Sequence, residues 1–146
     1  MASLTAQAQN LVLDALLRGT AITTPTTWYI ALLTTMGASN FLAGVEVLGG
    51  SYERAVVPAT LAAWAGTQGQ GSTGISIGLG GNTSNNAAIR FPSPSANWGE
   101  IVGYEFWDQA VNGTRWLYDT LLVPKTVSVG DPGITFPAGE LMISFI

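Results

Sequence analysis

The feature that most constrains the fold is a succession of short β-rich segments separated by glycine, proline and asparagine turns. Their spacing is typical of a sandwich or barrel. Few helical patterns interrupt them, which disfavours alternating strand–helix units and a parallel sheet. The chain is therefore predicted to be mainly β, an antiparallel β-sandwich or a barrel-like module with one N-terminal α-helix. The expected strands cover residues 28–34, 45–48, 52–57, 87–91, 98–106, 115–122, 126–129 and 141–146.

Prolines and one Asn-Gly pair punctuate these segments. Asn112-Gly113 lies between two aromatic-rich segments, which predicts a hairpin with a type I′ turn. This turn makes Trp107 and Trp116 candidate cross-strand neighbours. Proline ends a strand because it has no N–H to donate to the ladder. Strands are therefore expected to stop at Pro58, to end at Pro92 and to end before Pro124.

Residues 3–18 have the one convincing helical pattern. Ser3 is a candidate N-cap, Gly19 stands where a left-handed C-cap is expected, and Arg18 suits the negative end of the helix dipole. A helix docked on its own domain is favoured over a helix that binds a partner, although the apolar stripe is wide. The stripe contains Leu4, Ala8, Leu11 and Ala15 and is widened by Val12, Leu13 and Leu16.

The segment from about residue 66 to 86 is rich in glycine, glutamine and asparagine and is predicted to be a flexible excursion. A short alternating stretch at residues 75–79 suggests a hairpin within it. No Lys-Ser or Lys-Thr pair follows the glycines, so a phosphate-binding loop is not expected. Residues 1–146 are predicted to form a single domain, with the helix at 3–18 and a β-rich module at 26–146.

The chain has no histidine and no cysteine, and only 10% of its 146 residues are charged. Nucleophile–imidazole catalysis, thiolate chemistry and metal sites built from imidazole or thiolate ligands are therefore excluded. A surface with so little charge lacks the repulsion that keeps proteins monomeric. This composition favours a subunit partly covered by its neighbours, with a compact monomer as the alternative.

Two further classes of partner are disfavoured. The net charge is −4 and the basic residues are scattered, so direct binding of nucleic acid is not expected. No apolar stretch approaches the ~18–20 residues of a membrane span. No basic region precedes an apolar core at the N-terminus, so a signal peptide is not expected either. The basic residues are Arg18, Arg54, Arg90, Arg115 and Lys125.

Carboxylates are the best remaining candidates for chemistry, and the set comprises Glu100, Glu105, Asp108 and Asp119. Glu105 and Asp108 point to opposite faces of a strand, and Glu100 lies roughly 26 Å from Asp108 at the strand rise. A glycosidase needs two carboxyl groups about 5–10 Å apart, which this spacing does not arrange. Asp131 lies in a Gly-Asp-Pro-Gly turn and is expected to bond local backbone rather than calcium. No catalytic, cofactor-binding or metal-binding residue is predicted.

The five tryptophans suggest a platform on which sugars could stack. Aromatic side chains dominate cores as well as interfaces, so most of the five are expected in the core. Trp64 lies beside the Gly/Gln-rich segment and is the candidate for an exposed contact residue, with a host cell-surface glycan as its ligand. The five are Trp28, Trp64, Trp98, Trp107 and Trp116.

Several sequence blocks, spread over most of the chain, carry a resemblance to a known family. They are LLRGTA at 16–21, PTTWYIAL at 25–32, GSYER at 50–54, NAAIRFP at 86–92, WGEI at 98–101, FWD at 106–108, PKTVSVGD at 124–131 and FPAGEL at 136–141. In this order and spacing the chain resembles a family of small tailed-bacteriophage proteins usually called tail fibre proteins. The Gly/Gln-rich stretch at 66–81 is longer than the linker usual in that family.

The resemblance implies a non-enzymatic structural protein of the virion, made in the cytoplasm of the host bacterium and assembled with other virion proteins. It supplies no catalytic residue to carry over. The length of the chain favours a compact module over a complete extended fibre. A trimer or another symmetric ring is expected, because virion components follow the symmetry of the particle. Two alternatives stay open: a protein that decorates or cements the capsid, and a receptor- or glycan-binding module.

Overall fold

The computed structural model describes residues 2–78 and 80–145. Leu79 and Ile146, with which two of the predicted segments end, lie outside the described residues, as does Met1. The described chain forms a mainly β fold with an N-terminal helix, as predicted from the sequence. The elements are β1 (Ser3–Leu4), α1 (Ala6–Leu17), β2 (Thr27–Thr35), β3 (Val45–Glu46), β4 (Ala55–Pro58), β5 (Asn82–Ser84), β6 (Ile89–Arg90), β7 (Gly99–Trp107), β8 (Arg115–Val127), β9 (Thr135–Phe136) and β10 (Met142–Ser144).

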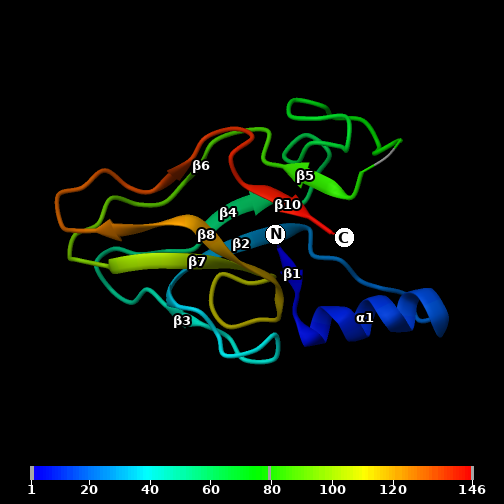
Figure 1. The fold of residues 1–146 in the computed structure, drawn as a ribbon, viewed down its shortest axis with the longest axis horizontal. Coiled ribbons are helices and arrows are strands. Elements are labelled where there is room, and N and C mark those ends of the chain that lie inside the picture. Colours follow the sequence, from blue (N-terminus) through cyan, green and yellow to red (C-terminus); the bar gives the residue numbers. More distant parts are fainter. Residues whose placement is uncertain (1, 79, 146) are drawn as a thin grey trace.

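A six-stranded antiparallel sheet forms the framework, with the strand order β1-β8-β7-β2-β3 and with β4 paired to the first half of β2 (Figure 1). The long strands β2, β7 and β8 lie at its centre. Residues 30–33 of β2 are all fully buried. Burial of consecutive residues means that both faces of β2 are covered, because successive side chains of a strand point to opposite faces.

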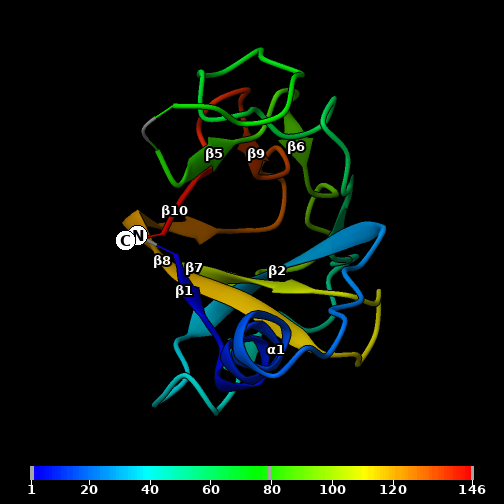
Figure 2. The ribbon, with the colours of Figure 1, turned by 90° about the vertical axis from the view of Figure 1, so that its right-hand side faces the viewer.

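Two small sheets cover one face of this framework, β5 with β10 and β6 with β9 (Figure 2). The hydrophobic core lies between the two layers, so the arrangement is sandwich-like. The main sheet contributes Ile30, Leu32, Ile101 and Phe106, and the second layer and its connections contribute Ile89, Phe91, Ile134, Leu141 and Ile143.

The helix begins three residues later than predicted. Thr5, not Ser3, is its N-cap, because the Thr5 hydroxyl accepts from the N–H of Ala8 at 3.2 Å. Ser3 instead pairs with β8 in the short strand β1. Gly19 has a positive φ of 68°, as predicted for a residue that follows a helix C-terminus.

The helix projects from the body rather than docking along it (Figure 1). Ala8, in its first full turn, is the one residue of α1 that is fully buried. The favoured prediction of a helix packed on its own domain is therefore met only at the N-terminal end of α1. In the part of the chain that is described, no helix has the length and apolar character needed to span a membrane.

One of the proline expectations is met and another is wrong. β4 begins at Ala55 rather than at Tyr52, but it ends at Pro58, so this strand stops at its proline as predicted. Pro124 lies within β8, where the predicted strands 115–122 and 126–129 join into one. Ile101 pairs with Lys125 and Gly103 with Thr120, so four residues of β8 bulge opposite the single residue 102 of β7. Proline is tolerated there because the bulge interrupts the ladder.

The turn between β7 and β8 uses the Asn-Gly pair in a longer loop than a two-residue hairpin. Asn112 and Gly113 both have positive φ, 58° and 87°, as a type I′ turn requires. Strand pairing nevertheless stops at Trp107 and Arg115, which are opposite each other. An irregularity in the ladder displaces Trp116, so the predicted pairing of Trp107 with Trp116 is wrong.

The Gly/Gln/Asn-rich excursion has regular structure only at its end. Residues 75–78 form no strand, whereas Asn82–Ser84 form β5 and pair with β10. Side chains hold the rest of it: the Thr67 hydroxyl donates to the carbonyl of Ile77 at 2.7 Å, and the Gln68 amide donates to the carbonyl of Ile75 at 2.7 Å. Its flexibility stays a prediction.

Candidate functional site

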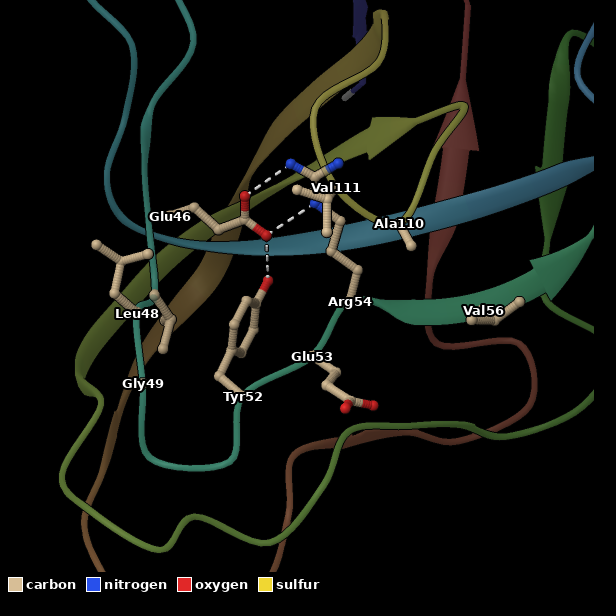
Figure 3. A pocket seen from close by; sticks show the side chains of 10 residues that line it. Glu46, Leu48, Gly49, Tyr52, Glu53, Arg54, Val56, Ala110 and Val111 are labelled. Atoms are coloured by element: carbon tan, nitrogen blue, oxygen red, sulfur yellow. Dashed lines mark hydrogen bonds and ion pairs between the residues drawn. The ribbon is translucent and has the colours of Figure 1, made fainter.

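A hollow of about 490 Å³ lies where the segment from β3 to β4 meets the β7–β8 loop (Figure 3). Apolar side chains form much of its wall, and an ion-paired cluster forms the rest. The lining residues are Glu46, Val47, Leu48, Gly49, Tyr52, Glu53, Arg54, Val56, Ala110 and Val111.

The ion-paired cluster is centred on the Glu46 carboxylate. Arg54 binds it in a bidentate manner, with Nε at 2.9 Å from Oε1 and Nη2 at 2.8 Å from Oε2. The hydroxyl of Tyr52 donates to Oε1 at 2.8 Å and accepts from the N–H of Leu32 at 2.9 Å (Figure 3). Bidentate, charge-assisted bonds of this kind fix geometry strongly. The cluster therefore ties β3 and the approach to β4 to the central strand β2.

Arg54 also fastens the β7–β8 loop. Its Nη1 donates to the carbonyls of Gln109 and Asn112 at 2.9 and 3.0 Å. Its guanidinium carbon lies 4.4 Å from the centre of the Trp107 ring, which is a cation–π distance. The Arg54 side chain thus contacts Glu46, the β7–β8 loop and the Trp107 ring at once, and these contacts hold the wall of the hollow in place.

Burial raises the pKa of Tyr52 well above its ordinary value, and the nearby Glu46 carboxylate raises it further. A phenol held neutral in this way donates a hydrogen bond but does not act as a base near neutral pH. The donors of Arg54 and the hydroxyl of Tyr52 are already hydrogen-bonded within the protein. The cluster therefore fixes the local structure and offers no group for catalysis.

The predicted carboxylate set does not converge. Glu105 is buried on β7 and forms an ion pair with Arg115 at 2.7 Å, while also accepting from the N–H of Gly44. Asp108 accepts from the N–H of Thr114 across the hairpin loop at 2.7 Å. Asp119 lies opposite Tyr104, one position along the ladder from Glu105, so its side chain points to the other face of the sheet from that of Glu105.

Tyr104 donates to that Asp119 carboxylate at 3.5 Å, and burial followed by the carboxylate's charge raises the pKa of Tyr104. Glu100 lies opposite Thr126 and is exposed. Within residues 2–78 and 80–145, no group of three carboxylates is arranged to hold a metal ion. Asp131 accepts from the N–H of Ser128 at 2.8 Å, so its predicted role in the local turn is confirmed.

The tryptophans pack in and around the core. Trp64 is half-buried, lies 5.6 Å from the Phe106 ring and donates its indole N–H to the carbonyl of Pro58 at 3.1 Å. Trp28 forms edge contacts with both Phe106 and Trp116. Trp64 and its neighbours line a shallow apolar groove without a charged residue. Glycan binding at Trp64 stays a prediction, and the indole N–H of Trp64 itself is already bonded to Pro58.

Large apolar side chains are exposed over much of the remaining surface. They lie on α1, between β2 and β3, around the hollow, on the β8 bulge, on β10 and at the tip of the excursion. They include Leu13, Leu16, Leu17, Phe41, Leu48, Val56, Ile75, Ile77, Val111, Leu122, Val123 and Met142. Where several of them lie together, as Leu13, Leu16 and Leu17 do on α1, they form a candidate contact surface.

Residues 3–144 match the sequence model of a family described as podophage GP4 fiber I protein gp80. The chain belongs to this phage fibre family. This fibre protein is a non-enzymatic structural component of the tail fibre and of the virion. The resemblance to tail fibre proteins seen in the sequence is thereby confirmed, and the tail fibre is favoured over the capsid shell. No curated protein matches the chain.

The structure also shows what two of the quoted sequence blocks do in the fibre protein. Tyr52 and Arg54, from the block at residues 50–54, build the ion-paired wall of the hollow. Gly50, which opens that block, has a φ of 59° and packs against Trp98, whose indole N–H donates to the Gly50 carbonyl at 2.9 Å. A side chain at position 50 would collide with that ring.

Asn85 has a structural role that the sequence analysis missed. It is fully buried, its amide donates to the carbonyls of Phe136 and Pro137, and its oxygen accepts from the N–H of Leu141. The blocks at 86–92 and 136–141 are therefore joined in space beside one asparagine. Asn in a Gly/Ser-rich stretch is also an ordinary loop residue, so composition alone could not single it out.

Proposed function

We propose that this fibre protein assembles as a symmetric homo-oligomer, a trimer or a ring, in which helix α1 packs against a neighbouring copy. The observation that carries the proposal is the apolar stripe on the outer part of α1. Leu16 and Leu17 are 75% and 80% exposed, and Leu13 is half exposed on the same face. Residues three and four apart share one face of a helix, so these leucines form a continuous surface.

Helix stability supports the same conclusion. Isolated helices shorter than about 12–15 residues are marginal in water and gain stability by packing an apolar face. α1 has 12 residues and buries only Ala8 fully within its own chain. A second copy of the chain supplies a packing surface for the remaining turns.

The charges of α1 do not oppose such packing. Asp14 and Arg18 form an ion pair with each other at 2.8 Å on the exposed surface. This pair neutralises the formal charges of the helix side chains, so two helices approaching each other carry no strong mutual repulsion.

Light scattering during gel filtration tests the proposal. The chain has a mass of 15.2 kDa, and the expected result is an integral multiple of that mass, which falls towards 15.2 kDa in the double variant Leu16→Glu/Leu17→Glu. The matched control is Leu61→Glu/Val129→Glu, which places the same charges at two exposed aliphatic positions outside the helix. A wild-type protein that stays monomeric at high concentration would overturn the proposal.

A further inference from the structure

We infer that the β8 bulge of one fibre protein seats in the Arg54 hollow of a second copy. The β8 bulge is residues 121–124 with the adjoining Lys125, and the Arg54 hollow is the site lined by Glu46, Glu53, Arg54 and their apolar neighbours. This inference rests on the proposed self-assembly and names a specific contact for it.

The β8 bulge is an apolar protrusion. Leu122 is 99% exposed, and Val123 beside it is also exposed. Leu121 points back and packs against the core, which anchors the protrusion on the sheet. Bulged residues have no ladder partner, so their side chains are displayed at the surface of β8.

Protection of a free strand edge accounts for part of this segment but not for all of it. β1 covers β8 only at Leu117 and Tyr118, so the rest of β8 is an open edge. A bulge, a proline and a lysine are common devices that prevent such an edge from pairing with other strands. Two exposed aliphatic side chains do not serve that purpose, because they increase the tendency to associate. Leu122 and Val123 therefore indicate a contact.

The Arg54 hollow has the complementary form. Leu48, 88% exposed, and the exposed Val56 and Val111 stand around it. Its ion-paired wall is fixed, because Arg54 and Glu46 are bonded to each other and Arg54 is also bonded to the β7–β8 loop. A preformed apolar depression with a fixed polar wall accepts an apolar side chain at low entropic cost.

The charges of the two surfaces are also complementary. Glu53 lies at the hollow with its carboxylate directed away from Arg54 (Figure 3), and it forms no ion pair among the described residues. Lys125 flanks the β8 bulge, and the ion pairs of the described residues likewise do not include it. Arg54 and Glu46 neutralise each other, so Glu53 gives the hollow a net negative charge that fits the lysine. Complementary charges of this kind set the register of an interface.

One chain cannot make this contact with itself. Figure 2 shows the β7–β8 loop, which borders the hollow, at the right, while β8 runs to the left before it bends. The two surfaces lie on different sides of the molecule, so the contact joins unlike surfaces of two copies. A head-to-tail contact closes into a ring or continues as a filament, depending on the rotation between the copies.

Engineered disulfides test the inference cleanly, because the natural chain has no cysteine. Val123→Cys and Val111→Cys change one exposed residue of the bulge and one of the hollow. Mixed and oxidised together, they are expected to form a covalent dimer that neither variant forms alone. The control pair is Val129→Cys with Val111→Cys, which shares the hollow cysteine but places its partner beyond the bulge.

Charge reversal provides a second readout. Glu53→Lys and Lys125→Glu are each expected to weaken self-association at least about tenfold, because each brings like charges together. The double variant is expected to restore most of the loss. Failure of the double variant to recover association would overturn the pairing of these two residues.

The outcomes separate this inference from the proposed function. A disulfide between two Val123→Cys chains would indicate a two-fold contact and overturn the inference. The absence of any crosslink in a protein that light scattering shows to be oligomeric would overturn the contact while leaving the oligomer standing. A protein that is monomeric throughout would overturn both.

Discussion

Arg54 and Arg115 show how single residues organise this fold, since each pairs with a carboxylate and also fastens a loop. Arg54 binds Glu46 and the β7–β8 loop. Arg115 binds Glu105 and donates to the carbonyl of Asn40 at 2.6 Å. Two of the five cationic side chains are therefore used inside the molecule, which further lowers the charge of its surface.

Removing the carboxylate of Glu105 should destabilise the protein strongly. In Glu105→Ala, the guanidinium of Arg115 stays buried without its counter-charge, which costs about 3–5 kcal/mol. Chemical denaturation measures the loss. The control is Asp14→Ala, which breaks the exposed pair with Arg18 and is expected to change stability by less than about 1 kcal/mol. Equal effects of the two variants would contradict the prediction.

Alkaline pH should destabilise the protein through its buried tyrosines. Burial raises the pKa of Tyr52 and Tyr104 above the ordinary value of about 10. Below that value both states are neutral and stability is complete. Above it, the unfolded chain loses phenolic protons that the folded chain retains, so stability falls as pH rises.

Tyrosinate absorbance followed together with circular dichroism checks this behaviour. Tyr52 and Tyr104 are expected to ionise only when the fold is lost, and Tyr104→Phe is expected to reduce the loss of stability above pH ~10. Ionisation of both residues in a protein that keeps its folded spectrum would contradict the prediction.

At the scale of the elements, helix α1 is fixed at its first turn and free beyond it. The Thr5 hydroxyl donates to the carbonyl of Arg115 at 2.6 Å and accepts from the N–H of Ala8. One buried side chain thus caps the helix and attaches it to β8. The outer turns lack such an anchor, and they are the part that we propose packs against a neighbouring copy.

The variant Thr5→Ala should loosen this attachment. It removes the cap and leaves buried polar groups unsatisfied, for a loss of about 1–2 kcal/mol. Thermal unfolding measures the change. Ser3→Ala, at the position that the sequence favoured as the cap, is exposed in β1 and is expected to alter stability by less than about 0.5 kcal/mol. A larger loss of stability in Ser3→Ala than in Thr5→Ala would contradict the assignment of Thr5 as the N-cap.

The strands that could be predicted are those whose own residues identify them. The apolar, β-branched and aromatic runs of β2 and β7 were located to within a residue or two because their burial is a local signal. β5 and β9 are two or three residues of ordinary loop composition, and they exist only because distant partners pair with them. Contacts between residues more than forty positions apart leave no periodicity in the sequence.

The candidate site was less predictable than the fold. Glu46 and Arg54 are eight residues apart and meet because the chain reverses between β3 and β4. The backbone carbonyls of Gln109 and Asn112, in the β7–β8 loop, accept hydrogen bonds from Arg54. The sequence resemblance marked the block at residues 50–54 without giving it a role. The position of the β8 bulge was missed because Pro124 was expected to end a strand. It lies instead within β8, where the pairing with β7 is interrupted.

At the scale of the whole molecule, little charge and abundant exposed aliphatic surface act together. The chain carries a net charge of only −4, while leucines and valines are exposed on the helix, the hollow and the bulge. Weak repulsion and apolar contact both favour association over a solitary subunit. The protein is part of the tail fibre assembly, and we propose that neighbouring copies cover these surfaces there.

The thermal stability of the protein should therefore depend on its concentration. Association stabilises the folded state by mass action, and a tenfold rise in concentration is worth up to about 1.4 kcal/mol per subunit contact. For a chain of this size, each kcal/mol raises Tm by about 2–4 °C. Calorimetry over a hundredfold range of concentration measures the shift. The variant Leu16→Glu/Leu17→Glu is expected to show a constant Tm, and a constant Tm in the unaltered protein would contradict the prediction.

The excursion from residue 66 to 78 has a consequence for how the molecule can vary. Its shape is set by bonds from its own hydroxyl and amide groups, such as those of Thr67 and Gln68, and its tip residues Ile75 and Ile77 contribute nothing to the core. Substitutions at that tip, and short insertions beside it, change the outline presented to the surroundings while the framework below stays as it is. New surface chemistry can therefore be acquired there without loss of folding.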